Sequence, residues 1–151
     1  MHDGMSRDIT MYWFVYSSEY AAYMTGVLGS SVTRLENNLL NDLYRGFLNR
    51  LPDTAGFATQ LTAMRTAQAS DAAAVRSTTL AIALNFLGGP EYPLRLHTNT
   101  QFIEDCYNGI LLRGALAAEI QGWVNLLTAG ASRTEVLIGF VNSPEFQARV
   151  A

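Results

Sequence analysis

The stretch LENNLLNDLYRGFLNRL, residues 35–51, has the clearest helical pattern in the sequence. Its apolar residues recur at intervals of three and four, which places them along one side of an α-helix. They are Leu35, Leu39, Leu40, Leu43, Tyr44, Phe47, Leu48 and Leu51. The other side carries Asn37, Asn38, Asn41, Asp42, Arg45 and Asn49. We therefore expect one amphipathic helix with its apolar side on a core and its polar side in solvent.

Several positions have the spacing of a helix start, in which a hydroxyl residue is followed three residues later by an acid or an amide. Each of the two side chains then satisfies a backbone N–H of the other residue. The pairs are Thr33 with Glu36, Thr98 with Gln101 and Ser132 with Glu135. No segment alternates between apolar and polar residues over the length of a strand. The sequence therefore predicts an all-α fold.

The chain also resembles itself. At a shift of 63 residues, LYRGFLNRLPDTAGFATQL (43–61) aligns with CYNGILLRGALAAEIQGWV (106–124). The first copy then has nine extra residues, after which the shift becomes 54 and FLGGPEY (86–92) aligns with FVNSPEF (140–146). FVYSSEY (14–20) resembles the same phrase.

This alignment predicts two related multi-helix units, residues 33–97 and 98–151, packed into one compact domain. Residues 1–32 would be a partial, aromatic-rich unit that ends an earlier copy. The predicted fold class is therefore all-α and built from related units.

The phrase FVNSPEF is explained by structure alone, so we do not interpret it as a binding motif. Asn142 is expected to end one helix in the left-handed conformation. Ser143 can cap the next helix, with Pro144 in its first turn. Glu145 would then lie near the positive end of that helix.

The phrase RLPDTAGF (50–57) predicts a second joint between helices. Arg50 is expected at the end of a helix, where it can contact the last carbonyls, and Pro52 is expected to stop that helix. Asp53 would cap the next helix and pair with Arg50. The second copy, RGALAAEI (113–120), keeps Arg113 but places Glu119 where the first copy has Gly56.

Composition argues against several function classes. The net charge is −3, and the ten basic residues are all Arg, scattered singly, so the sequence lacks the basic face typical of nucleic-acid binding. Cys106 is the single cysteine, which excludes an intrachain disulfide. No apolar stretch is long enough to cross a membrane, and residues 1–8 do not read as a secretory signal. The sequence does not decide in which cellular compartment the protein works.

No catalytic arrangement is visible in the sequence. His97 is one of two histidines, and we expect it in a solvated loop rather than as a metal ligand. Cys106 is expected to be a small buried hydrophobe. Glu104 and Asp105 are adjacent, so on a helix they point to different sides. We expect no metal site, no cofactor and no enzymatic activity.

The aromatic residues near the N-terminus are the feature most suggestive of binding. Tyr12, Trp13, Tyr16 and Tyr23 are the candidate interface residues, because Tyr and Trp are common in protein interfaces and in sugar-stacking sites. The alternative is that the aromatic rings of this segment pack against the first complete unit, and we expect this of Trp13, Phe14 and Tyr20. An incomplete unit also leaves part of its core face for a partner or a second copy to cover.

The joint phrases resemble the bacterial domain-of-unknown-function family 4214, which is helical and related to the phycobilisome linker domain. The first match consists of Leu43, Tyr44, Leu48, Arg50, Pro52, Asp53, Gly56, Phe57, Phe86, Pro90, Glu91 and Tyr92. The second consists of Tyr107, Leu111, Arg113, Trp123, Phe140, Ser143, Pro144, Glu145 and Phe146. Gln60 departs from the family pattern, which usually has Trp there; Trp123 satisfies it in the second copy.

The resemblance implies tandem modules within larger bacterial proteins, often secreted or surface-associated, and it implies no established activity. The linker relatives are assembly proteins. We therefore expect a non-enzymatic module for protein interaction or self-association. The alternative is a carbohydrate-binding accessory module that uses exposed aromatic residues. A small hydrolase would need a nucleophile and a base that the sequence does not place together.

Overall fold

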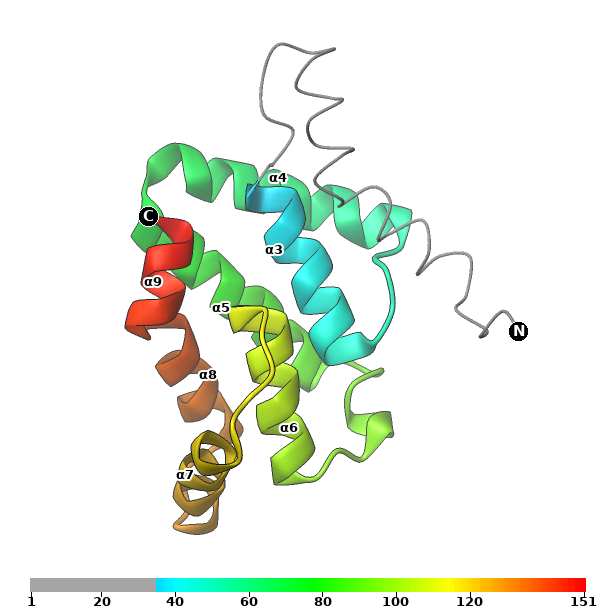
Figure 1. The fold of residues 1–151 in the computed structure, drawn as a ribbon. Helices are drawn as coiled ribbons and strands as arrows, with labels where there is room; N and C mark the ends of the chain where they lie inside the picture. The colour runs from blue at the N-terminus through cyan, green and yellow to red at the C-terminus, as the bar shows by residue number, and fades with distance from the viewer. Residues whose placement is uncertain (1–34) are drawn as a thin grey trace, which may run out of the picture. The chain divides into compact units, whose positions relative to one another are not determined.

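Helices make up most of residues 35–151, the part of the chain that the computed structural model describes (Figure 1). The α-helices are α3 (Leu35–Leu43), α4 (Thr54–Ser70), α5 (Ala72–Gly88), α6 (Asn99–Cys106), α7 (Ala117–Thr128), α8 (Arg133–Val141) and α9 (Pro144–Val150). Two π-helical turns, η1 (Tyr44–Leu48) and η3 (Tyr107–Leu111), and one 3₁₀ turn, η2 (Pro93–Arg95), complete them. No strand occurs within residues 35–151, so the all-α prediction is confirmed.

The predicted helix over residues 35–51 forms, but it is shorter than expected. Its α-helical part ends at Leu43, and a π-helical turn continues to Leu48. Asn49 then adopts the left-handed conformation with φ 51° and ends the helix. Pro52 therefore lies beyond the end and does not stop this helix, and Leu51 is 41% exposed instead of belonging to the buried stripe. Both predictions were wrong.

The apolar side of this helix is the centre of the core. Leu39, Leu40, Leu43 and Phe47 are at most 1% exposed. The expected polar side is wrong at two positions, because Asn41 and Asp42 are also buried. Here η3 packs against α3, and Arg149 of α9 pairs with Asp42. Packing of the second half of the chain on this side is what removes these polar residues from solvent.

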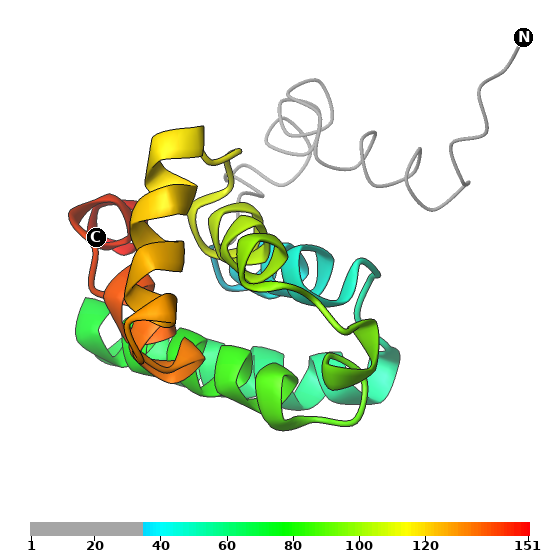
Figure 2. The same ribbon diagram turned by 90° about the horizontal axis from the view of Figure 1, so that it is seen from below.

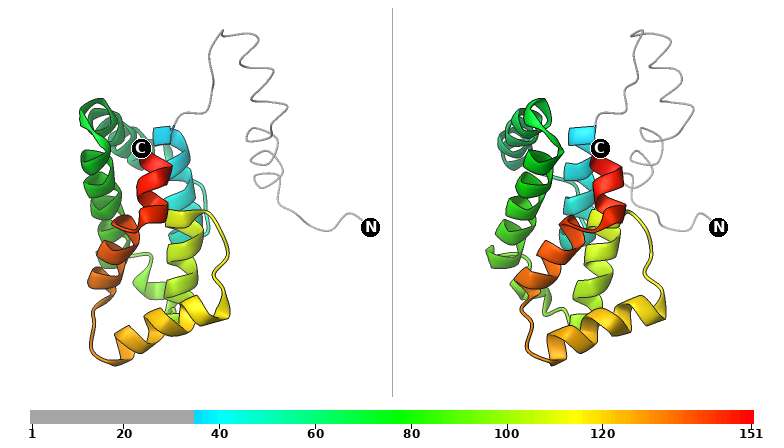
Figure 3. Two further views of the ribbon diagram at one scale, coloured as in Figure 1. Left: turned by 60° about the vertical axis from the view of Figure 1, so that its left-hand side comes forward. Right: turned by 90° about the vertical axis from the view of Figure 1, so that its left-hand side faces the viewer.

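α4 and α5 form a helix pair joined by a single residue, Asp71. The Asp71 carboxylate accepts the Ala74 N–H at 2.7 Å and caps α5. α8 and α9 return against α5, and α9 lies beside α5 and η3 (Figure 3). α7 crosses between α6 and α8 at one end of the unit (Figure 2). Residues 35–151 thus form one compact unit.

The predicted helix starts at Thr98 and Ser132 are confirmed, each with both hydrogen bonds of a capping box. Thr33, in the third predicted pair, lies outside the described residues. Ser143 caps α9, with Pro144 in the first turn as expected. Asn142 is not left-handed, since its φ is −97°, so that prediction was wrong. Residues 35–151 contain no helix that is both long and apolar enough to span a membrane.

Candidate functional site

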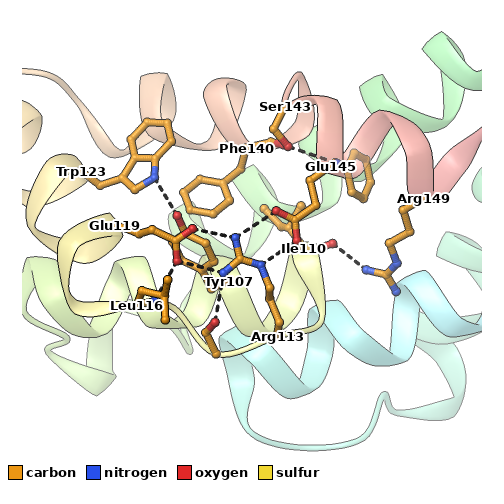
Figure 4. Close-up of polar contacts among 12 residues, drawn as sticks. Tyr107, Ile110, Arg113, Leu116, Glu119, Trp123, Phe140, Ser143, Glu145 and Arg149 are labelled. Atoms are coloured by element: carbon orange, nitrogen blue, oxygen red, sulfur yellow. Dashed lines mark hydrogen bonds and ion pairs between the residues drawn. The ribbon is translucent and has the colours of Figure 1, made fainter.

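Arg113 is the centre of a cluster that joins α7, α9 and η3 (Figure 4). Its Nε and Nη2 atoms donate to the two carboxylate oxygens of Glu145, at 2.7 and 3.0 Å. Its Nη1 and Nη2 atoms donate to Glu119, at 2.9 and 2.8 Å. The guanidinium lies over the ring of Tyr107, 4.7 Å from its centroid. One arginine thus binds two carboxylates in a forked geometry and stacks on an aromatic ring.

The charged groups of this cluster shift one another's pKa values. Hydrogen bonds from Arg113 lower the pKa of Glu119 to about 2, and the Leu116 N–H contributes to the same shift. Arg113 likewise lowers the pKa of Glu145. The hydrogen bonds that Arg113 donates to both carboxylates raise its own pKa. Both carboxylates are therefore held in the ionised form.

Arg50 is the centre of a corresponding cluster in the first half of the unit. Its Nε and Nη2 atoms each donate to Glu91 at 2.8 Å, and its guanidinium lies 5.1 Å from the Tyr44 ring centroid. Asp53 is 3.7 Å away and caps α4 by accepting the Gly56 N–H at 2.8 Å. The expected pairing with Asp53 is present. Arg50 Nη1 donates to the carbonyl of Leu51 at 3.0 Å, and Leu51 is outside the helix. The predicted contact of Arg50 with the last helical carbonyls was therefore wrong.

The remaining residues of the two predicted motifs hold the chain in place around these arginines. A side chain at Gly56 would lie 3.0 Å from the Tyr44 hydroxyl oxygen and 3.1 Å from Asp53, so this position has little room. Pro52 lies in the connection just before the Asp53 cap. Ser143 accepts the Phe146 N–H at 3.2 Å, which sets the start of α9 and places Glu145 opposite Arg113. These contacts give the motifs a structural role.

Both halves share further geometry at the 63- and 54-residue shifts. Arg95 donates to the Phe47 carbonyl and Arg149 to the Ile110 carbonyl, each at 2.6 Å. Tyr44 packs edge-on against Phe86 at 4.8 Å, and Tyr107 against Phe140 at 4.9 Å. Asn49 and Leu112, which end the two π-helical turns, are both left-handed, with φ 51° and 60°.

A buried polar network surrounds Asp105. The Tyr92 hydroxyl donates to Asp105 Oδ2 at 2.7 Å, and His97 Nδ1 lies 2.6 Å from the same oxygen. Burial, followed by this hydrogen bond, raises the pKa of Tyr92. The His97 side chain is only 14% exposed, so the predicted solvated loop histidine was wrong. The sequence shows only that an acid recurs at the aligned positions 42 and 105, and in the structure both acids are buried and paired.

Other candidate groups show no reactive arrangement. Cys106 is fully buried, as predicted, and burial raises the pKa of its thiol well above the usual value, which disfavours a nucleophilic thiolate. Within residues 35–151, no three His, Cys, Asp or Glu side chains gather as a metal site would need. The predicted interface residues Tyr12, Trp13, Tyr16 and Tyr23 lie outside the described residues.

The comparison with protein families finds one match. Residues 83–150 match the family described as domain of unknown function (DUF4214). The match includes the Arg113 cluster and supports the resemblance seen in the sequence. The comparisons with curated proteins and with solved structures give no match.

Proposed function

We propose that the chain is a non-enzymatic interaction or assembly module, and that it forms part of a larger bacterial protein at the cell surface or outside the cell. Residues 33–97 and 98–151 are, in this proposal, two tandem copies of the matched family. The recurring contacts of Arg50 and Arg113, and of Arg95 and Arg149, support the tandem arrangement, because they occupy aligned positions.

The exposure of Leu94 and Leu96 is the observation that carries the interaction proposal. Both residues belong to the short connection between α5 and α6, and they are 81% and 85% exposed although leucine is apolar. Leu96 is also left-handed with φ 52°, a conformation that Asn or Gly adopts at lower cost. Leucine at this position contributes little packing within the described unit. A role in contact with another molecule accounts for its presence.

Light scattering behind size exclusion, over a wide concentration range, tests this proposal. We expect the chain to self-associate, and the double variant Leu94→Asn/Leu96→Asn to weaken that association at least tenfold while the unfolding midpoint stays unchanged or rises. Leu112→Asn is the matched control, since Leu112 is also left-handed and 56% exposed. A wild-type chain that stays monomeric throughout would contradict self-association.

The N-terminal aromatic residues form a second arm of the same experiment. We expect Tyr12→Ala, Tyr16→Ala and Tyr23→Ala, combined in one variant, to weaken self-association while the fold stays intact. Global unfolding of this variant would instead place the rings in a core. The carbohydrate-binding alternative depends on the same segment, and loss of glycan binding in Trp13→Ala would support it.

A further inference from the structure

A groove of about 460 Å³ lies between the end of α5, the turn η2 and the start of α8. Leu84, Leu87 and Pro93 give it an apolar wall, and Arg133 and Thr134 form a polar side. This volume lies within the usual range of ligand-binding clefts. No Asp or Glu is among the groove-lining residues.

Arg133 has an uncompensated charge in this groove. Arg50, Arg65, Arg113 and Arg149 all form ion pairs with carboxylates, whereas Arg133 forms none with a carboxylate of the described residues. Its hydrogen bonds go to neutral acceptors, the His97 carbonyl at 2.6 Å and the Asn99 side-chain oxygen at 3.3 Å, and both come from Nη2.

The Arg133 side chain is also fixed in position. Its guanidinium lies over the Phe102 ring, 4.8 Å from the centroid, and His97, which accepts from it, is itself held by Asp105. A cation that is already ordered loses little conformational entropy when it binds an anion. The arginine fork matches a carboxylate, with Nε and Nη1 making no hydrogen bond to a described residue.

We propose that this groove binds a segment of a partner protein in which a carboxylate lies beside aliphatic side chains. The carboxylate pairs with Arg133, and the aliphatic groups pack on Leu84, Leu87 and Pro93. This inference rests on the proposed interaction function and names the chemistry of one partner segment. Charge complementarity decides the occupant, because the groove offers one fixed cation, an apolar wall and no competing acid.

NMR titration of the whole ¹⁵N-labelled chain tests the proposal with a defined probe. The probe is the capped peptide acetyl-Ala-Leu-Glu-Leu-Ala-amide, and its matched control has Gln in place of Glu. We expect the acidic peptide to shift the amide signals of Leu87 and Thr134, and the neutral peptide to bind at least tenfold more weakly. Absence of shifts up to about 10 mM acidic peptide, or equal binding of both peptides, overturns the proposal.

Two variants separate the groove from general surface charge. Arg133→Gln removes the cation, and Arg76→Gln on the earlier part of α5 is its control, since Arg76 does not line the groove. Gly88→Phe adds a ring to a residue that lines the groove and keeps Arg133, and a Cβ at Gly88 meets no atom within 4 Å. Gly122→Phe on α7 is its control, with the same open surroundings.

We expect Arg133→Gln and Gly88→Phe each to weaken peptide binding at least tenfold, and both controls to bind as the wild type does. Equal loss in a variant and its control overturns the proposal. Light scattering on the same samples distinguishes the two claims. A wild-type chain that self-associates but does not bind the acidic peptide overturns the groove proposal alone, whereas a monomeric wild type that binds the peptide overturns self-association alone.

Discussion

The Arg50 and Arg113 clusters solve the same structural problem with different local chemistry. Each arginine stacks on a tyrosine and binds a glutamate from the phrase that follows, Glu91 or Glu145. In the first cluster the next helix is capped by Asp53, 3.7 Å from its arginine. In the second, position 116 is a leucine, and Glu119 bonds both the Leu116 N–H and the arginine. The acid that contacts both the start of the helix and the arginine can thus stand at different positions, at the N-cap in the first cluster and three residues later in the second.

The surroundings of Tyr44 and Tyr107 differ, because a large ring beside Tyr107 is matched by a glycine that makes room for it. Trp123 donates its indole N–H to the Tyr107 hydroxyl at 3.3 Å and stacks on Phe140. Its ring needs Gly139, where a Cβ would lie 2.7 Å from the indole. The aligned positions of the first half are Gln60 and Asn85, so the large ring and the glycine are both absent there.

The contact between the two halves is the first place to test this correspondence. A Cβ at Gly46 would lie 2.4 Å from the Gly109 Cα, a backbone atom that cannot move aside alone. We expect Gly46→Ala to lower the free energy of unfolding by about 3 kcal/mol, because overpacking separates the halves. Urea denaturation measures it.

Two further alanines calibrate that result. Gly109→Ala meets the Phe47 ring at 3.1 Å, so we expect a smaller loss than at Gly46. Gly122→Ala, at an open helical position, is the control and should be neutral or stabilising by up to about 1 kcal/mol. A Gly46→Ala protein as stable as the wild type would contradict the close approach.

The aligned acids Asp42 and Asp105 are expected to differ in importance. Asp42 is 3% exposed and pairs with Arg149, so Asp42→Asn leaves a largely buried arginine without its counter-charge. We expect a loss of about 2 kcal/mol. At Asp105→Asn the amide oxygen can still accept from Tyr92, and we expect about 1 kcal/mol. Chemical denaturation of both variants ranks them, and the reverse order would show that the Asp105 network is the stronger.

Gly139→Ala tests the compensation around Trp123. Alanine in a helix normally stabilises relative to glycine, but here the new methyl group collides with an indole held on two sides. We expect a net loss of about 1 kcal/mol and a change in Trp fluorescence. Asn85→Ala at the aligned position is the control, with a gain of a few tenths of a kcal/mol from helix propensity. A stabilised Gly139→Ala protein would mean that Trp123 repacks freely.

The arginines themselves give the smallest expected effects, since both are half-exposed and surface ion pairs contribute little. We expect Arg113→Gln to lower Tm more than Arg50→Gln, because Arg113 is bidentate with two carboxylates and Arg50 with one. Thermal unfolding followed by circular dichroism compares them. A larger loss for Arg50→Gln would show that the Glu119 contact adds nothing.

The pH dependence sharpens the same test. Arg113 lowers the pKa of Glu119 to about 2 and also lowers the pKa of Glu145, so their contribution to stability is present above their ordinary pKa and is lost as pH falls through the lowered pKa values. The difference in stability between wild type and Arg113→Gln should therefore shrink between about pH 5 and pH 2. A difference that stays constant over this range would point to lost packing rather than lost charge.

The sequence predicted the helical elements well because their signals are local. Capping at Thr98, Ser132 and Ser143 depends on residues three apart, and the buried stripe of α3 on spacings of three and four. The wrong predictions concern helix ends, where the same residue type can adopt more than one conformation. Proline and asparagine can each end a helix, and Asn49 does so in place of Pro52, whereas Asn142 does not adopt the left-handed form.

The candidate sites were predicted only in part. The motif residues Arg50 and Arg113 were found from the sequence, but their main partners, 41 and 32 residues away, were not. His97 looked like a solvated loop residue because nothing nearby in the sequence shows that Asp105 and Tyr92 enclose it. No local pattern in the sequence predicts that Arg133 lacks a carboxylate partner, because that depends on which distant residues pack around it.

The sequence by itself determined that residues 35–151 are all-α and where most of their helices begin. Those properties follow from hydrogen bonds and side-chain spacing within one or two helical turns. Only the tertiary structure decided which charges pair over long distances in the sequence, since Arg149 and Asp42 are 107 residues apart. It also decided that Asp42 is buried and that the two glycines, Gly46 and Gly109, touch. Such contacts depend on how whole helices pack, which no short segment encodes.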